Sequence, residues 1–326
     1  MLTVTANFNH LIASELRAVD ALFARELTSE LPHVNALVTY VSKFRGKMLR
    51  PMLVLLSGLA AGDSPLTDEH LTLATVVEMV HVAALVHDDV LDDAEIRRQG
   101  ATINHLHGNE AAVLLGGYLA SHAYHLCSSL GSQDAARLIA HTTNLVCEGE
   151  LIQNFNRNNW KLDEKTYYLI IYRKTAALTE VCCRLGAMAS TRAASHMESL
   201  AAYGRKIGLA FQIADDILDI CGEQATVGKS LGTDIEKGKL TLPMIHFLKH
   251  ASSRQRETLI EQLESDESDR IARVRELIAA SDSIAYARSE AERLVNESIA
   301  ALQMLPFSDA RESLVQMAHY VTEREK

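Results

Sequence analysis

The stretch ALVHDDVLDDAEIRR, residues 84–98, runs from an apolar segment into a cluster of carboxylates and then into two arginines. A second stretch, FQIADDILDI at residues 211–220, repeats the apolar run and the same DDxxD spacing. Side chains three and four residues apart share one face of a helix, so the aspartates of each stretch project together. Like charges this close repel one another, and their apolar flanks are not those of a solvated surface. The pattern predicts two helices whose carboxylates are compensated by a cation.

The rest of the chain predicts an all-α protein. Of its 326 residues, 48% are hydrophobic and 23% are charged, which is ordinary for a globular chain. The chain contains 5 prolines, and none lies between Pro65 and Pro243. Strands need frequent turns, and turns favour proline and glycine, so a long proline-free run favours long helices. Without a low-complexity linker, we expect residues 1–326 to form a single domain, a large helix bundle.

Apolar residues recur at three- and four-residue spacing through most of the sequence. The helices expected from this spacing lie near residues 7–26, 32–44, 49–61, 68–93, 109–130, 133–157, 164–190, 195–221 and 239–250, with several more between 254 and 324. Turn residues break the pattern at 62–65, 100–108 and 222–238. We expect the residues after 251 to form amphipathic helices on the outside of the bundle and to contain no catalytic residues.

Composition and charge also restrict the partners and the cellular location that we expect for the protein. The formal net charge is -10 and no dense basic run is present, which argues against a nucleic-acid partner. The 5 cysteines show no metal-binding spacing and predict buried free thiols. The first residues lack the pattern of a secretory signal, and apolar runs such as PMLVLLSGLAAG fall short of a membrane span. We expect a cytoplasmic protein, with at most a weak peripheral association with membranes.

The two acidic clusters indicate a magnesium-phosphate site. Mg²⁺ usually takes one or two carboxylates together with phosphate oxygens and waters. Cations that could bind the phosphates are spread along the chain, where arginine offers a planar fork and lysine a point charge. They are Lys47, Arg50, Arg97, Arg98, Lys174, Lys229 and Lys239. The alternatives are a solvated acidic face for each motif and an ordinary surface position for each cation. Two complete motifs together favour the site.

At this point the sequence resembles the trans-isoprenyl diphosphate synthases, also called polyprenyl synthetases, along nearly its whole length. The motifs that carry the resemblance keep the order of that family: GKMLRP (46–51), HDDVLDDAEIRR (87–98), EGELIQ (148–153), KTA (174–176), FQIADDILD (211–219) and GKSLGTDIEKGKLTLP (228–243). The resemblance implies an isoprenoid synthase-like helix bundle with an elongated central cavity. It also implies a homodimer that joins an allylic diphosphate to isopentenyl diphosphate.

The resemblance further implies a role for each site residue. Metal ligands would be Asp88, Asp92 and Asp215, with about three Mg²⁺ ions in each active site. Further aspartates assist them: Asp89, Asp216 and Asp219. The allylic diphosphate would contact Arg97, Lys174, Lys229 and Lys239, and Asp234 is a further substrate-binding residue. Isopentenyl diphosphate would lie against Lys47, Arg50, His81 and Arg98. The reacting centre would be lined by Thr175 and Gln212.

The sequence departs from the family pattern at three positions. Arg45 and Gln99 stand where the family often has glycine, and Gly117 stands where aspartate is common. Arg45 could alter the basic pocket, and Gly117 could remove a hydrogen bond behind the metal ligands. None of the three removes a proposed ligand.

The residues before the first motif bear on product length. Ala84 and Val80 share the helix face of Asp88, Ala83 lies beside them, and short-chain members of the family carry bulky aromatics one turn upstream of the motif. We therefore expect a long product of about six to nine isoprene units, since residues four apart lie on one face. The alternative is that Ala83 and Ala84 only allow close helix packing while Leu114, Leu115 or Tyr118 closes the cavity, which would give a geranylgeranyl or farnesyl product.

Other functions remain open. A class I terpene cyclase shares the fold and the first motif, but the second DDxxD and GKMLRP argue against it. A non-catalytic partner subunit would be expected to lose ligands, and a helical metal-binding scaffold would leave the basic motifs unexplained. Two histidine pairs, His105 with His107 and His122 with His125, have metal-compatible spacing but are expected to be structural, since no third ligand is near.

Overall fold

The structure is a computed structural model, and it describes residues 10–43, 46–62, 65–98, 100–191, 193–222 and 231–323. Helices dominate these residues, and their only sheet is a two-stranded hairpin, which confirms the all-α prediction. The chain divides into two compact units. The first contains residues 1–143, 179–204 and 302–316, and the second contains residues 144–178, 205–301 and 317–326. That all 326 residues act as one domain stays a prediction.

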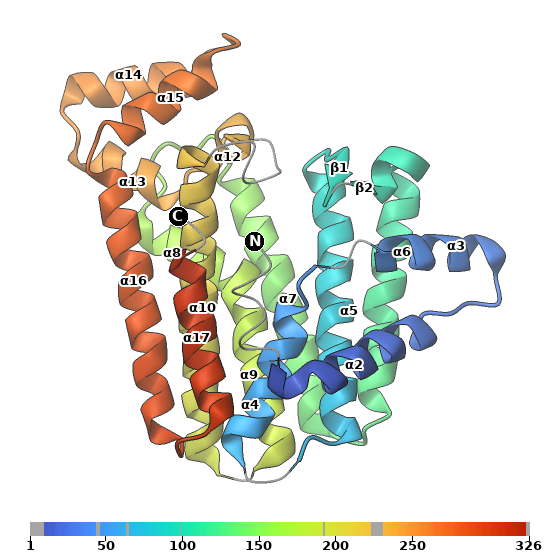
Figure 1. Cartoon of the computed structure of the whole chain (residues 1–326). Coiled ribbons are helices and arrows are strands. Elements are labelled where there is room, and N and C mark those ends of the chain that lie inside the picture. Colours follow the sequence, from blue (N-terminus) through green and yellow to red (C-terminus); the bar gives the residue numbers. More distant parts are fainter. Residues whose placement is uncertain are drawn as a thin grey trace. The chain divides into compact units, whose positions relative to one another are not determined.

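The first unit is built around α5 (Asp68–Leu91), which packs against its neighbours on several sides. These are α2 (Ala13–Glu26), α4 (Leu49–Ala61) and α6 (Ile103–Ser128), preceded by η1 (His10–Ile12), with α3 (Pro32–Lys43) beside α6. Figure 1 shows α5 and α6 running alongside one another. The hairpin joining them pairs β1 (Ile96–Arg97) with β2 (Gly100–Ala101), antiparallel.

The core position of α5 corrects one expectation. This helix is long and apolar enough to cross a membrane, so the prediction that every apolar run is too short was wrong. However, 72% of its most apolar window is buried inside the protein. Leu73, Val76 and Val77 along it are fully buried. Its apolar character is therefore that of a core helix.

The second unit contains the helices around the second motif. They are α8 (Glu164–Ile171), the π-helical turn η2 (Tyr172–Ala176), α12 (Thr233–Glu236), α13 (Leu242–His250), α14 (Ser253–Glu264), α15 (Arg270–Ala279) and α16 (Ser283–Ala301). Within it, α13 packs against α16, and α14 pairs with α15. Four further helices contribute residues to both units: α7 (Gln133–Phe155), α9 (Ala177–Ser190), α10 (Ala194–Cys221) and α17 (Asp309–Glu323), the last preceded by η3 (Leu302–Met304).

Two predicted boundaries differ from the structure. The single helix expected at 164–190 is three segments, because the π turn η2 separates α8 from α9. The break expected at 100–108 is already helical from Ile103, where Thr102 caps the helix, and only Gly108 departs, with φ of 82°. Three cysteines are buried as expected, whereas Cys147 and Cys221 are exposed, so the prediction was wrong for these two.

Candidate active site

The first aspartate motif lies at the carboxyl end of α5. Asp88 is in the last turn and Asp92 follows the helix, with its N–H donating to the Asp88 carbonyl at 2.8 Å. Both side chains are half-buried. The negative end of a helix dipole disfavours carboxylates. Two carboxylates at this end therefore form a place where a bound cation is strongly favoured.

Asp89, between them, has a different environment. It is buried, 6% exposed, and accepts a hydrogen bond from Arg97 Nε at 2.6 Å. Burial raises the pKa of this carboxyl, and the charge of Arg97 opposes that rise. Asn104 donates to the backbone carbonyls of Asp89 and Ala94, at 3.3 and 3.1 Å. Asp89 thus fixes the hairpin that carries Arg97 and Arg98, beside a pocket lined in part by Val86.

Three of the predicted isopentenyl residues, Arg50, His81 and Arg98, lie near one another in the first unit. Burial lowers the pKa of His81 well below its ordinary value, and the positive charges of Arg50, Arg98 and Arg97 lower it further. A neutral His81 therefore sits among the arginines. The guanidinium of Arg98 lies so close to Gly46 that a Cβ there would be 2.5 Å from Nη2. The GKMLRP motif therefore lies directly against Arg98.

Lys47, next in that motif, is exposed, and Arg50 is half-buried in the first turn of α4. Sequence reasoning missed Glu78, which is only 2% exposed on the otherwise apolar buried face of α5. Burial lowers the pKa of Arg98, and the negative charge of Glu78 opposes this. The sequence could have indicated Glu78, because it is an acidic residue within an apolar helical run, three positions before His81.

The second motif lies near the carboxyl end of α10, where Asp215 is half-buried and Asp216 is 4% exposed. Asp216 accepts hydrogen bonds from Tyr167 Oη at 2.6 Å and from Gln212 Nε2 at 2.9 Å. Burial and then the charge of Asp234 raise the pKa of Asp216, while the two hydrogen bonds oppose the rise. Asp216 is therefore held from two sides by protein donors.

Asp219, the last residue of the motif, organises the following segment. Its Oδ1 accepts from the backbone N–H of Thr233 at 3.1 Å and from its hydroxyl at 3.0 Å. Its Oδ2 accepts from the N–H of Asp234 at 3.1 Å. Lys239 N–H in turn donates to the Asp234 carbonyl at 2.8 Å. The aspartate thus caps α12 and fixes the segment that carries Asp234 and Lys239, whereas Lys229 lies outside the described residues, as do Arg45 and Gln99.

The turn that follows α7 supports the same segment. Asn158 has a positive φ of 59°, and its N–H donates to the Gly238 carbonyl at 2.8 Å. A Cβ on Gly238 would lie 1.9 Å from Asn158 Oδ1. Gly238 also has φ of 64°, so both conformation and space require glycine there.

The EGELIQ motif on α7 holds Lys174. The ammonium of Lys174 donates to Gln153 Oε1 at 3.0 Å and forms an ion pair with Glu150. At Gly149 the backbones approach so closely that a Cβ would lie 2.6 Å from Lys174 N. Lys174 and Thr175 belong to the π turn η2, and such turns are often found at functional sites. Thr175 Oγ1 donates to Gln212 Oε1 at 2.8 Å, so the two residues expected at the reacting centre are in contact.

The donor set of the two motifs fits a hard divalent cation. Within the described residues, no three His, Cys, Asp or Glu side chains come close enough together to hold a metal ion. A pair such as Asp88 and Asp92 on one turn is nevertheless what Mg²⁺ uses when substrate phosphates and waters supply the other ligands. The chemistry of these carboxylates thus suits a metal that arrives with a diphosphate.

The chain-length residues lie on α5, where Val80 and Ala83 are each 4% exposed and Ala84 is half-buried. Among the alternatives, Leu115 is buried, but Leu114 is 74% exposed. Leu114 therefore does not line the interior of the first unit, whereas the alternative stands for Leu115 and for the half-buried Tyr118.

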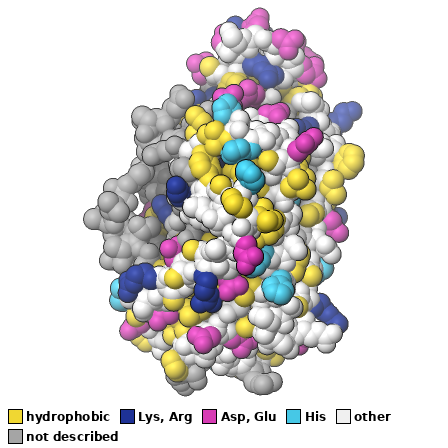
Figure 2. Space-filling model, turned by 90° about the vertical axis from the view of Figure 1, so that its right-hand side faces the viewer, with side chains coloured by type: hydrophobic (Ala, Val, Ile, Leu, Met, Phe, Trp, Pro, Cys, Tyr) yellow, Lys and Arg dark blue, Asp and Glu magenta, His cyan; other side chains and the backbone are white. Residues whose placement is uncertain are grey.

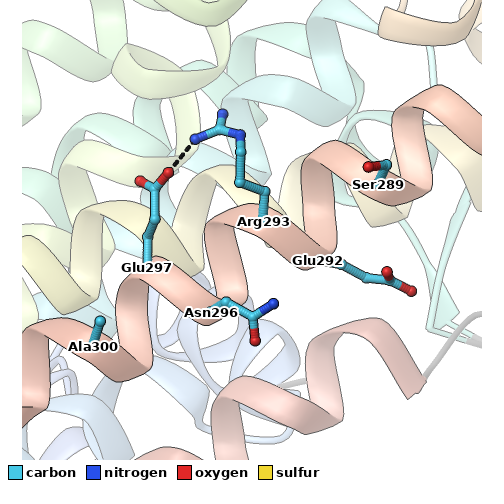
Figure 3. Close-up of a pocket in the computed structure, with 6 residues that line it drawn as sticks. All are labelled: Ser289, Glu292, Arg293, Asn296, Glu297 and Ala300. Atoms are coloured by element: carbon cyan, nitrogen blue, oxygen red, sulfur yellow. Dashed lines mark hydrogen bonds and ion pairs between the residues drawn. The ribbon is translucent and has the colours of Figure 1, made fainter.

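A separate hollow runs along α16. Figure 3 shows its six lining residues, all on this helix and mostly polar: Ser289, Glu292, Arg293, Asn296, Glu297 and Ala300. Arg293 forms ion pairs with Glu290 and Glu297, one helical turn away on either side. None of the predicted site residues lines this hollow, and it is the solvated face of a helix.

The chain is similar to known proteins along nearly its whole length. The family model described as Polyprenyl synthetase matches residues 31–280. The chain is 34% identical over 319 residues to octaprenyl diphosphate synthase of Escherichia coli, covering 98% of each. A decaprenyl diphosphate synthase from Rhodobacter capsulatus superposes with a TM-score of 0.92 at 30% identity, covering 99% of both chains. A polyprenyl synthase from Caulobacter crescentus, solved with calcium and isoprenyl diphosphate, gives 0.91 at 31% identity, covering 99% of this chain and 98% of that one.

Proposed function

Because the chain belongs to the polyprenyl synthetase family, we propose that it condenses an allylic diphosphate with isopentenyl diphosphate, repeatedly and head to tail. The product is a long-chain all-trans polyprenyl diphosphate of about C30–C45, a length that follows from the small residues one helical turn before Asp88. The observation that carries the proposal is the match along 98% of both chains to a long-chain synthase, with every proposed ligand of both DDxxD motifs present.

In each condensation the C–O bond of the allylic diphosphate breaks, and pyrophosphate leaves with the electron pair. The double bond of isopentenyl diphosphate attacks the allylic carbon, forming the new C–C bond. A proton then leaves the adjacent carbon, passes to pyrophosphate, and a new double bond forms. The dipoles of Thr175 and Gln212 would stabilise the allylic cation, and a water-free cavity would protect it from hydrolysis.

The divalent cation would be Mg²⁺, about three ions in each site, held by Asp88, Asp92 and Asp215 together with the diphosphate. When bound, it would neutralise the charge that develops on pyrophosphate. Arg97, Lys174, Lys229 and Lys239 would share this task. Lys174 already lies against Glu150 and Gln153, which support it in this position.

The residues around His81 would bind isopentenyl diphosphate. Lys47, Arg50 and Arg98 would contact its phosphates, and the buried carboxylate of Glu78 would offset part of their mutual repulsion. Asp89 would act through Arg97, which it holds at 2.6 Å. Asp216 and Asp219 would act through the residues that they anchor, and Asp234 would complete the substrate contacts.

A homodimer is the proposed assembly. On α6, Val113, Leu114 and Gly117 are exposed close together, and Leu106 is exposed before the kink at Gly108. Figure 2 looks onto the side of the first unit that carries α6 and shows hydrophobic and histidine side chains gathered there. Large exposed apolar patches mark protein interaction sites. We also propose a cytoplasmic location, with weak peripheral membrane association to release an apolar product.

Product analysis tests the function. The protein is incubated with Mg²⁺, farnesyl diphosphate and excess isopentenyl diphosphate, and the products are identified by mass spectrometry. We expect chains of about C30 or longer, because alanine at 83 and 84 leaves the cavity open. A stop at C20 would keep the chemistry and assign a geranylgeranyl product, whereas no product with any allylic primer would refute the proposal.

The variant Ala84→Phe tests the chain-length assignment. A phenylalanine one turn before Asp88 should shorten the product, because residues four apart share a helix face. Met304→Phe serves as the control, since Met304 is 68% exposed, lies outside the proposed dimer contact, and should leave the product distribution unchanged. An unchanged distribution in Ala84→Phe would remove Ala84 from the chain-length determinants.

A further inference from the structure

Four side chains of the second unit form a continuous hydrogen-bonded chain that ends at the expected reacting centre. Tyr167 Oη donates to Asp216 Oδ2 at 2.6 Å, and Gln212 Nε2 donates to Asp216 Oδ1 at 2.9 Å. Thr175 Oγ1 donates to Gln212 Oε1 at 2.8 Å. Tyr167 is 3% exposed, Asp216 4% and Thr175 9%, so water has little access to this chain.

The direction of each hydrogen bond in this chain follows from the contacts of Asp216. Both of its neighbours donate to it, Tyr167 to Oδ2 and Gln212 to Oδ1. Gln212 therefore turns its amide nitrogen toward Asp216 and its oxygen toward Thr175. The Thr175 hydroxyl has one proton, and that proton goes to Gln212. The lone pairs of the Thr175 oxygen are then left for a positive partner elsewhere.

Gln212 is the member whose orientation could otherwise vary. The oxygen and nitrogen of a glutamine amide have nearly the same shape, so hydrogen bonds alone decide which way the group points. The hydrogen bond to Asp216 Oδ1 orients the Gln212 amide, and Tyr167 holds the other carboxylate oxygen of Asp216. Tyr167 belongs to α8, whereas Asp216 and Gln212 belong to α10. The tyrosine thus ties two helices together through one carboxylate.

We propose that Tyr167 is a positioning residue for the condensation: by holding Asp216 it sets the orientation of Gln212, and so directs the oxygen of Thr175 toward the allylic cation. The inference rests on the proposed function and extends it to a residue that does not itself touch the substrates. The Thr175 oxygen stabilises the allylic carbon only when positive charge develops on it. It therefore lowers the free energy of the transition state more than that of the bound substrates.

The test is the Tyr167→Phe variant, which keeps the ring and removes only the donor. With farnesyl diphosphate, isopentenyl diphosphate and Mg²⁺, kcat for the first condensation should fall about tenfold or more, as small misplacements at a reacting centre do. The KM values of both diphosphates should stay within about twofold, because uniform binding is unaffected. A loss of packing alone would not separate kcat from KM in this way.

Tyr168→Phe is the matched control. Tyr168 is the next residue on α8, and its hydroxyl donates to Glu290 Oε2 at 2.9 Å, away from this chain. This variant also loses one tyrosine hydrogen bond, which is partly buried, so its thermal stability should fall as well. Its kcat should remain that of the wild type.

A second variant tests the same idea if Tyr167→Phe does not fold. Asp216→Asn keeps the size of the side chain but can present an amide N–H to Gln212, which would reverse that glutamine and the Thr175 hydroxyl. Its kcat should also fall. Wild-type kcat in either folded variant, or equal losses in Tyr167→Phe and Tyr168→Phe, would overturn the inference while leaving the proposed function intact. A wild-type chain that forms no condensation product would overturn both.

Discussion

At the scale of single residues, the aspartates of the two motifs have different tasks. Asp89, Asp216 and Asp219 each accept hydrogen bonds from protein donors: Arg97 for the first, Tyr167 and Gln212 for the second, and the start of α12 for the third. Their repeated DDxxD spacing hides this division. Part of each motif holds the loop or hairpin beside the site. Substituting these aspartates should therefore lower the free energy of unfolding as well as activity.

Asp219→Ala should lower the free energy of unfolding by about 1–3 kcal/mol, because the Thr233 hydroxyl and two N–H groups lose their acceptor. Urea unfolding at neutral pH measures this. Asp219→Asn retains one acceptor oxygen and should lose less. If the alanine variant is as stable as the wild type, the cap on α12 does not contribute to folding.

His81 should make stability depend on pH. Burial, then Arg50, Arg98 and Arg97, lower its pKa in the folded protein, whereas the unfolded chain takes up a proton near pH 6.5. Below that pH the unfolded state binds more protons, so the free energy of unfolding falls as pH falls, by at most about 1.4 kcal/mol per pH unit. Urea unfolding at pH 7.5 and 5.5 should show a smaller loss in His81→Gln. Equal losses in both proteins would contradict this account.

At the scale of elements, α7 and the π turn η2 cross so closely that their backbones leave no room for a side chain at Gly149. A π turn inserts one residue into a helix, which rotates the following side chains and places Lys174 beside Glu150 and Gln153. The crossing tolerates no Cβ on Gly149.

Gly149→Ala should therefore destabilise the protein by about 1–3 kcal/mol through overpacking and displace Lys174. Gly117→Ala is the matched control, because a Cβ at Gly117 meets nothing within 4 Å. Alanine has the higher helix propensity, so this control should be neutral or stabilising within the isolated chain. Thermal unfolding of both variants measures the difference, and equal melting temperatures would rule out the steric explanation.

The elements also show what could be predicted from the sequence. Periodicity found α4 at 49–61 with both ends correct, since its apolar run begins beside Pro51 and stops before Gly62. It could not find η2, because one inserted residue leaves the apolar spacing of 164–190 nearly unchanged. It also could not show that Asp216 contacts Tyr167, 49 residues away. Contacts between distant residues depend on packing, which a local pattern does not contain.

At the scale of the whole molecule, the proposed dimer depends on the outer face of α6. Leu114→Asp should weaken self-association, since a charge would enter a contact proposed to be apolar. Sedimentation velocity across a concentration series would measure self-association. The control is Glu292→Asp, an exposed position on α16, because Gly117 lies on the face that is being tested. A Leu114→Asp protein that sediments like the wild type would exclude this face as the interface.

The helices after residue 251 do more than cover the bundle. Arg275 of α15 donates to the Ile220 and Gly222 carbonyls, at 2.5 and 3.0 Å, and so caps the end of α10 just after the second motif. Glu290 of α16 accepts from Tyr168, and the Leu314 carbonyl accepts from Tyr203. The family match ends at residue 280, before both of these acceptors. An expression clone trimmed to the matched region would remove the acceptors of Tyr168 and of the buried Tyr203, so protein engineering of this enzyme has to keep the helices beyond residue 280.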